Sequence, residues 1–158
     1  MTYQEINSNL SIELLPNEIF KDIPDYEGLY QVSNLGRVKS LERIIKDTGI
    51  NRVRIRKEQI LKSFIQRDNY LLVNFYKNNK RKCFTIHRLV LLAFKGFSNL
   101  DCNHINGIKI DNRLENFVYC TKSENMFHAY RLGLKKITQT TINNGTILYK
   151  KYLKKSII

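Results

Sequence analysis

The residues best suited to chemistry lie between positions 102 and 125, in a segment that opens with the letters CNHING. His104 stands where a strand is expected to end and a loop to open, and its pKa near neutrality suits a general base that takes a proton from water. Asn103 offers an amide oxygen, a hard ligand for the divalent ion that phosphodiester hydrolysis commonly needs. Taken alone, this short string is more typical of an ordinary asparagine-rich turn.

Two later asparagines strengthen the catalytic interpretation. Asn125 lies 125 − 104 = 21 positions after His104, on a predicted helix. A strand–loop–strand–helix unit packs its helix back against the first strand, so Asn125 can meet Asn103 across a site. Asn116 ends the loop, and its amide can bind the loop backbone on two sides and fix the histidine.

The elements that must position these residues follow from hydrophobic periodicity. Ile86, Leu89, Val90, Ala93 and Phe94 share one helix face, which predicts a helix from Thr85 or Ile86 to Gly96. A second helix is expected from Thr121 or Ser123 to Gly133, with Glu124 completing a capping box with Thr121. Strands are expected at 29–33, 37–44, 60–66, 70–78, 100–105 and 117–121, with turns at 34–37 and 78–81, an exposed basic loop or hairpin tip at 46–58, and a frayed segment at 1–16.

The full string NHINGIKIDNRLENFVYCTKSEN, with HRLVLLAF at 87–94, resembles the HNH family of homing and phage-type endonucleases. The resemblance implies a ββα-metal (His-Me finger) core with His104 as general base and Asn116 as the residue that fixes the loop. It also implies Asn103 and Asn125 as ligands of one Mg²⁺ or Mn²⁺, and cleavage of double-stranded DNA that leaves a 5′ phosphate. Position 103 often carries aspartate in this family, so a neutral ligand there should attract the ion less strongly.

A second resemblance covers 19–41, which is similar to the small DNA-associated module that often precedes this nuclease core. The expected fold is therefore α+β: a β-rich module at 17–82, a nuclease core at 83–135 and a basic tail at 136–158 that faintly resembles a truncated DNA-binding module. The residues expected to contact DNA are His87, Arg88, Arg37, Lys39, Arg52, Arg54, Arg56, Lys57, Lys80, Arg81 and Lys82.

Charge and composition support a polyanionic partner. The 158 residues include 27 Lys and Arg against 14 Asp and Glu, a net charge of +13. A DNA-binding relative without catalysis and a structural RNA-binding protein would show the same excess, so both remain alternatives to a nuclease.

Cysteine usage and the N-terminal sequence indicate the cellular compartment of the protein. Cys83, Cys102 and Cys120 form no CxxC pair, so a zinc site with His87, His104 or His128 is disfavoured. Cys102 and Cys120, on two neighbouring predicted strands, are expected to be small buried groups. No secretory signal is expected, and the longest apolar run, at 89–94, is too short to span a bilayer. These features predict a soluble intracellular protein, in a host cytoplasm or nucleus, and no obligate protein partner is inferred. The resemblance to HNH endonucleases implies a phage or large-virus gene.

Overall fold

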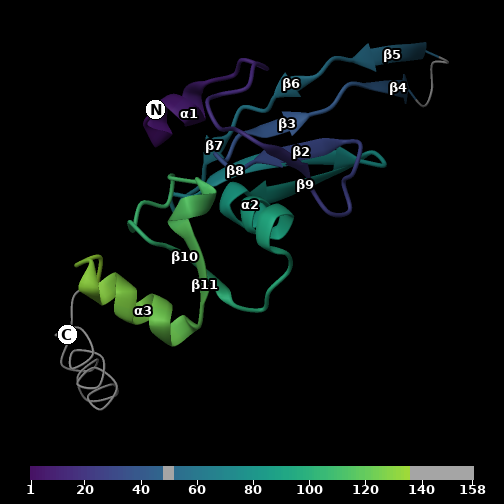
Figure 1. The fold of residues 1–158 in the computed structure, drawn as a ribbon. Helices are drawn as coiled ribbons and strands as arrows, with labels where there is room; N and C mark the ends of the chain where they lie inside the picture. Colours follow the sequence, from purple (N-terminus) through teal and green to yellow (C-terminus); the bar gives the residue numbers. More distant parts are fainter. Residues whose placement is uncertain (48–51, 136–158) are drawn as a thin grey trace.

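Short antiparallel strands and a few helices make up the computed structural model, which describes residues 1–47 and 52–135 (Figure 1). The elements in chain order are α1 (Tyr3–Ser8), β1 (Phe20–Asp22), β2 (Tyr30–Ser33), β3 (Val38–Ser40), β4 (Arg43–Asp47), β5 (Arg52–Arg56), β6 (Gln59–Ile60), β7 (Phe64–Ile65), β8 (Leu71–Lys77), β9 (Lys80–Thr85), α2 (Ile86–Lys95), β10 (Asp101–His104), the 3₁₀ turn η1 (Leu114–Asn116), β11 (Phe117–Cys120) and α3 (Lys122–Arg131).

The strands form several small sheets rather than one large one. One sheet has the order β1-β2-β3-β6 and another has β7-β8-β9, while β4-β5 and β10-β11 are two-stranded pairs. Every pair is antiparallel. This arrangement confirms the predicted α+β class.

Helix α2 holds the sheets together. Its apolar face buries Ile86, Leu89 and Val90, as the periodicity predicts, and it ends at Gly96, whose φ of +80° favours glycine. The helix packs against β2, β8 and β9 and also contacts η1. Tyr30 and Phe75 stack beside it, with ring centroids 4.1 Å apart, so two sheets and one helix share a core.

This core joins the two halves of the sequence. It contains Ile23 and Val38 from the N-terminal half together with Leu89 and Phe117 from the C-terminal half. The predicted boundary between residues 82 and 83 falls inside β9. The division into a module and a nuclease core stays a prediction, and the tail at 136–158 lies outside the described residues.

Three local predictions are wrong. The single strand expected at 60–66 is two short strands, β6 and β7, which belong to different sheets. Residues 1–16 were expected to fray, but Tyr3–Ser8 form a helix, because Thr2 and Glu5 make a capping box and Ile6 is 2% exposed. The strand expected at 37–44 is interrupted after Ser40: β3 pairs with β2, while β4 leaves that sheet and pairs with β5. Within the basic segment expected at 46–58, Arg52–Arg56 therefore form a strand that pairs with β4, and residues 48–51 lie outside the described part of the chain. Among the described residues no helix is long and apolar enough to cross a membrane.

Candidate active site

The strand pair β10-β11 places the predicted base. His104 lies opposite Phe117 and Asn103 lies opposite Val118, and the intervening residues 105–116 form the loop between the strands. Helix α3 follows β11 directly and packs against β10. Thr121 caps α3 through a capping box with Glu124, as the sequence predicts.

Asn116 holds the two ends of this loop together. Its side-chain Nδ2 donates to Asn106 Oδ1 and to the carbonyl of Asp111, both at 3.0 Å, and its Oδ1 accepts from the backbone N–H of Asn106 at 3.0 Å. Its carbonyl accepts from the N–H of Ile105 at 2.9 Å. The residue after His104 is thus fixed by Asn116, the residue that directly precedes β11.

Asp111 gives the loop a second anchor. Its carboxylate is fully buried and accepts two hydrogen bonds of 2.8 Å from the guanidinium of Arg113 and one of 2.7 Å from Asn106 Nδ2. Burial alone would raise the pKa of this carboxyl, but the bonds from Arg113 and Asn106 outweigh it and hold the pKa below its ordinary value. Asp111 therefore stays ionised while supporting the loop.

The imidazole of His104 lies among aromatic rings. Its centroid is 4.9 Å from Phe117, 5.3 Å from His87 and 5.9 Å from Tyr70. Burial lowers the pKa of His104 to about 4, although the charge of Asp111 acts in the opposite direction. Burial likewise lowers the pKa of His87 to about 3. Both rings are neutral at pH 7. The Nε2 of His104 is buried, and no described residue forms a hydrogen bond with it.

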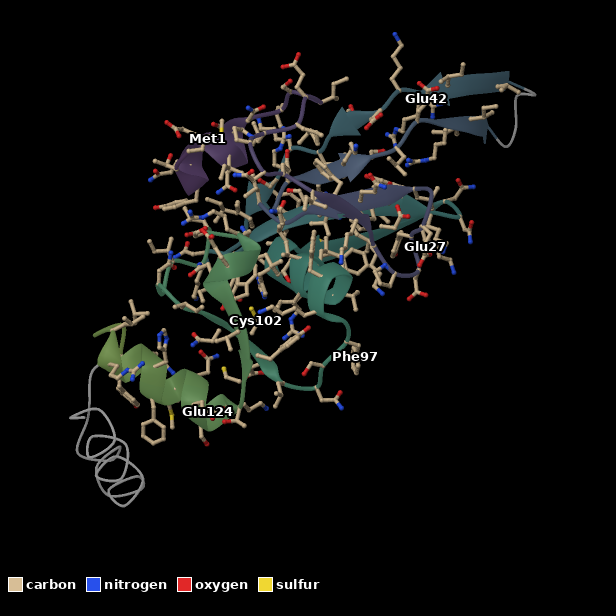
Figure 2. All side chains as sticks on the ribbon, viewed as in Figure 1. Met1, Glu27, Glu42, Phe97, Cys102 and Glu124 are labelled. Carbon is tan, nitrogen blue, oxygen red and sulfur yellow. The ribbon has the colours of Figure 1, made fainter. Side chains whose placement is uncertain are left out.

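One cleft brings three of the predicted residues together. Asn103 and His104 from β10 and Asn125 from α3 line the same open space of about 490 Å³. The cleft lies where α3, which carries Glu124, faces the strand of Cys102 (Figure 2). The other residues lining it are Tyr70, Asp101, Cys102, Gly107, Lys109, Lys122, Met126, His128, Ala129, Leu134 and Lys135.

Gly107 lets the loop approach the end of α3. Its φ is +73°, and a Cβ at this position would lie 2.8 Å from the side chain of Leu132 and 2.9 Å from that of Leu134. Both contacts are with the terminal carbons of flexible side chains, which can move away. The positive φ is therefore the feature that favours glycine at this position of CNHING.

Comparison with known proteins places this site in a family. A model of the HNH endonuclease family matches residues 84–127, and a model of the NUMOD4 motif matches residues 18–76. A solved structure described as DNA binding and cleavage by the HNH homing endonuclease I-HmuI superposes with a TM-score of 0.60 at 31% identity, covering 82% of this chain and 67% of that one. The chain belongs to the HNH endonuclease family.

Curated HNH relatives come from viruses. DNA endonuclease I-HmuI of Bacillus phage SP01 is 32% identical over 122 residues, and an uncharacterized HNH endonuclease of Acanthamoeba polyphaga mimivirus, L247, is 36% identical over 135 residues. These alignments cover 76% and 80% of this chain but only 62% and 29% of the two relatives. The chain therefore spans less than two thirds of either curated relative.

The oxygen atoms in the cleft of Asn103, His104 and Asn125 suit a hard divalent ion that also binds substrate. Asn103 and Asn125 contribute amide oxygens, and Asp101 is the carboxylate among the described residues that line the cleft. The described residues contain no cluster of three or more His, Cys, Asp or Glu side chains suited to a metal. Such a set suits a hard divalent ion that keeps waters and phosphate oxygens among its ligands, rather than a closed zinc site.

The structure corrects two of the predicted DNA contacts. Arg37 is 3% exposed, and its guanidinium pairs with Glu18 and donates to the carbonyls of Ser11 and Glu13. His87 is 6% exposed, with its ring 4.7 Å from that of Tyr70. Both side chains are used inside the protein, so neither reaches a DNA phosphate.

The remaining predicted contacts divide between different surfaces. Lys39 forms an ion pair with Glu58 at 2.8 Å. In β9 the side chains alternate, so Lys80 and Lys82 lie on the opposite face from Arg81. Four of the remaining side chains are exposed, namely Arg54, Lys57, Arg81 and Arg88. Arg56 is half-buried. Arg52 is the first residue of β5.

Tyr70 and Lys109 are the cleft residues that sequence reasoning missed. The ammonium of Lys109 lies 4.7 Å from the ring centroid of Tyr70 and donates to the carbonyl of Asp68 at 2.9 Å. Tyr70 directly precedes β8, more than thirty positions before His104, so no local pattern could connect the two. His128 also lines the cleft.

Proposed function

We propose that this chain is a metal-dependent endonuclease that hydrolyses phosphodiester bonds of duplex DNA, of the homing or mobile-element type. The observation that carries the proposal is the gathering of His104, Asn103 and Asn125 in one cleft, beside a loop that Asn116 fixes. Membership of the HNH family and similarity to a DNA-cleaving homing endonuclease support the same activity.

His104 is the proposed general base. A base must reach the reaction in its neutral form, and burial keeps this imidazole neutral at cellular pH. The edge of Phe117 and the rings of Tyr70 and His87 limit the orientations of His104. Asn116 acts indirectly, because it fixes the loop that follows the histidine.

The proposed cofactor is one Mg²⁺ or Mn²⁺, held by the amide oxygens of Asn103 and Asn125 and completed by phosphate oxygens of the substrate. A bound divalent ion supplies charge stabilisation to the phosphate and to the departing 3′ oxygen, which leaves a 5′ phosphate on the product. Lys109 and Lys122 line the same cleft and add positive charge for the flanking phosphates.

The outer face of the β7-β8-β9 sheet is the proposed duplex-binding surface. A shallow groove of about 740 Å³ on this face is lined by side chains of alternating positions in β8 and β9, namely Leu72, Asn74, Arg81, Cys83 and Thr85, together with Phe64 and Gln66. Amide and guanidinium groups are the ones that read base edges in the major groove, and this face presents both.

Plasmid cleavage tests the proposal. Supercoiled plasmid should be nicked or linearised in Mg²⁺ or Mn²⁺, and a chelator should abolish the reaction. DNA binding without cleavage in either ion would indicate a binding protein that has lost catalysis. Stronger binding of structured RNA than of duplex DNA would point to an RNA-binding protein and contradict the proposal.

A further inference from the structure

The catalytic loop, residues 105–116 between β10 and β11, is held from outside by the N-terminal half of the chain. Asn7 of α1 donates from its Nδ2 to the carbonyl of Ile110 at 2.9 Å, and α1 lies above this loop in Figure 1. The ammonium of Lys109 donates to the carbonyl of Asp68, also at 2.9 Å. Two segments that are far away in the sequence therefore hold the middle of the loop.

The β2-β3 turn, residues 34–37, contacts the same loop at backbone distance. The carbonyl of Asn34 accepts from the N–H of Leu114 at 2.7 Å. A Cβ on Gly36 would lie 2.6 Å from the Cβ of Asn112 and 2.9 Å from its carbonyl oxygen. Neither atom can rotate away, because one is bonded to the backbone and the other belongs to it. The absence of a side chain at Gly36 thus lets the turn lie directly against the catalytic loop.

The β2-β3 turn is firmly attached to its own half of the chain. The side chain of Asn34 accepts from the N–H of Ile19 at 2.8 Å and donates to the carbonyl of Asn17 at 3.0 Å. The hydroxyl of Ser33 accepts from the N–H of Arg37 at 3.0 Å. Because these bonds fix the turn from within the N-terminal half, it can act as a rigid support for the loop.

The contact at Asn112 leads to His104 through hydrogen bonds inside the loop. Asn112 is 1% exposed and directly follows Asp111. The carbonyl of Asp111 accepts from Asn116 Nδ2 at 3.0 Å, and its carboxylate accepts from Asn106 Nδ2 at 2.7 Å. Asn116 in turn accepts from the N–H of Asn106 at 3.0 Å. A shift of Asn112 would therefore disturb the bonds that fix the backbone after His104.

We infer that the N-terminal half positions the catalytic loop for hydrolysis, with Gly36 as the principal positioning residue and Asn7 as a second. The inference rests on the proposed function in taking His104, at the start of this loop, as the base. The N-terminal half thus contributes to hydrolysis by holding the active site in shape, independently of any contact that it makes with DNA.

Hydrogen–deuterium exchange of backbone amides, followed by NMR on the full chain in EDTA without DNA, tests the positioning directly. Gly36→Ala places a Cβ against Asn112, so the catalytic loop must move. The amides of Ile105 and Asn106, which donate to Asn116, should then exchange about tenfold faster. Amides of β8 that pair with β9 report opening of the whole fold and should exchange as in the wild type.

Gly28→Ala is the matched control. Gly28 also has a positive φ, +69° against +91° for Gly36, so alanine strains the backbone at both positions. Apart from its chain neighbours, no described residue has an atom within 4 Å of a Cβ at Gly28. The control therefore carries the strain without the contact, and it should leave the exchange of Ile105 and Asn106 unchanged.

Plasmid cleavage under single-turnover conditions and duplex affinity in EDTA separate positioning from binding. Gly36→Ala should lower the cleavage rate at saturating protein on the order of 10²-fold, the effect expected when a catalytic group is displaced by about 1 Å. Its duplex affinity should remain that of the wild type. Gly28→Ala should retain both the rate and the affinity.

Asn7→Ala keeps the test decisive if Gly36→Ala does not fold. It removes one hydrogen bond to the catalytic loop from a helix at the protein surface, so it should speed exchange at Ile105 and Asn106 and slow cleavage, both less than Gly36→Ala. Gln4→Ala, on the same helix, is its control, since Gln4 donates to Tyr3 within α1.

Wild-type exchange of the two loop amides in both Gly36→Ala and Asn7→Ala would overturn the inference. Equal acceleration in the two controls would also overturn it, as would faster exchange in Gly36→Ala with an unchanged cleavage rate. If the wild-type chain never cuts plasmid but Gly36→Ala speeds exchange as expected, the proposed nuclease is refuted and the positioning of the loop by the N-terminal half stands.

Discussion

The imidazole of His104 meets the ring of Phe117 edge-on, with centroids 4.9 Å apart and ring planes at 89°. The two residues face each other across the β10-β11 pair, so the first residue of the return strand forms part of the wall around the base. The orientation of the His104 ring is therefore coupled to the pairing of β10 with β11.

Replacement of His104 by Ala should remove cleavage and leave DNA affinity near that of the wild type. A general base contributes about 10²–10⁴-fold to the rate and nothing to docking. Single-turnover cleavage of plasmid and duplex binding in EDTA measure the two effects. His128→Ala, at another residue of the cleft, is the control and should retain most activity. Wild-type cleavage by the His104 variant would exclude this residue as the base.

Asn103 and Asn125 should determine the metal concentration that cleavage requires. Asn103→Ala and Asn125→Ala should each raise the Mg²⁺ or Mn²⁺ concentration that half-saturates cleavage, because each removes one oxygen donor. Asn103→Asp should hold the ion at least as well as the wild type, since a carboxylate is the better hard ligand. Calorimetric titration with Mn²⁺ checks affinity without relying on activity. Identical titrations for both alanine variants and the wild type would remove these residues from the site.

Loss of the Asn116 side chain should loosen the loop. Asn116→Ala removes three hydrogen bonds and leaves the carbonyl of Asp111 and the N–H of Asn106 unpaired. Leaving buried polar groups unpaired costs about 1–3 kcal/mol in the free energy of unfolding. Cleavage should fall with little change in DNA affinity, and Asn116→Asp should be intermediate because it keeps the acceptor and loses the donor. Full activity together with wild-type stability in the alanine variant would contradict this role.

Loss of Arg37 should lower the free energy of unfolding, whereas loss of Arg81 should weaken duplex binding. Arg37→Met leaves the buried carboxylate of Glu18 without its partner and should cost about 3–5 kcal/mol in unfolding free energy. Duplex affinity of the folded variant should be unaffected. Arg81→Met, at an exposed position of β9, should change stability by less than about 0.5 kcal/mol and weaken duplex binding. Chemical unfolding and duplex binding distinguish the two, and a reversal of the pattern would refute the burial argument.

The ion pair between Arg37 and Glu18 should make the free energy of unfolding depend on pH. Burial alone would raise the pKa of Glu18, but hydrogen bonds from Arg37 and from the backbone of Leu15 outweigh it and lower the pKa below its ordinary value. A carboxyl with a lowered folded pKa contributes stability above its unfolded pKa and loses it as pH falls through the folded pKa. Wild-type stability should therefore drop in this acidic range, and Glu18→Gln should show a smaller drop. Parallel pH profiles for the two would rule out this contribution.

Local pattern by itself determined several parts of the protein. The spacing of Ile86, Leu89 and Val90 determined α2, and Thr121 with Glu124 determined the start of α3, because helix faces and caps depend on residues three or four positions apart. The order of the motif residues from His104 to Asn125 also indicated a strand, a loop, a strand and a helix. The similarity to HNH endonucleases was likewise readable from contiguous residues.

Other properties depended on contacts between distant segments, which only the tertiary structure decided. Arg37 resembles any surface arginine in sequence, and its burial follows from Glu18 and from carbonyls 24 and 26 positions upstream. The ring of Tyr70 lies 5.9 Å from that of His104, centroid to centroid, because the fold brings together two segments that are far apart in the sequence. The low pKa of His104 arises from desolvation, a property of the packed site that the type of residue does not reveal. Sequence neighbours thus determined the elements, while packing determined which charges face solvent and which face one another.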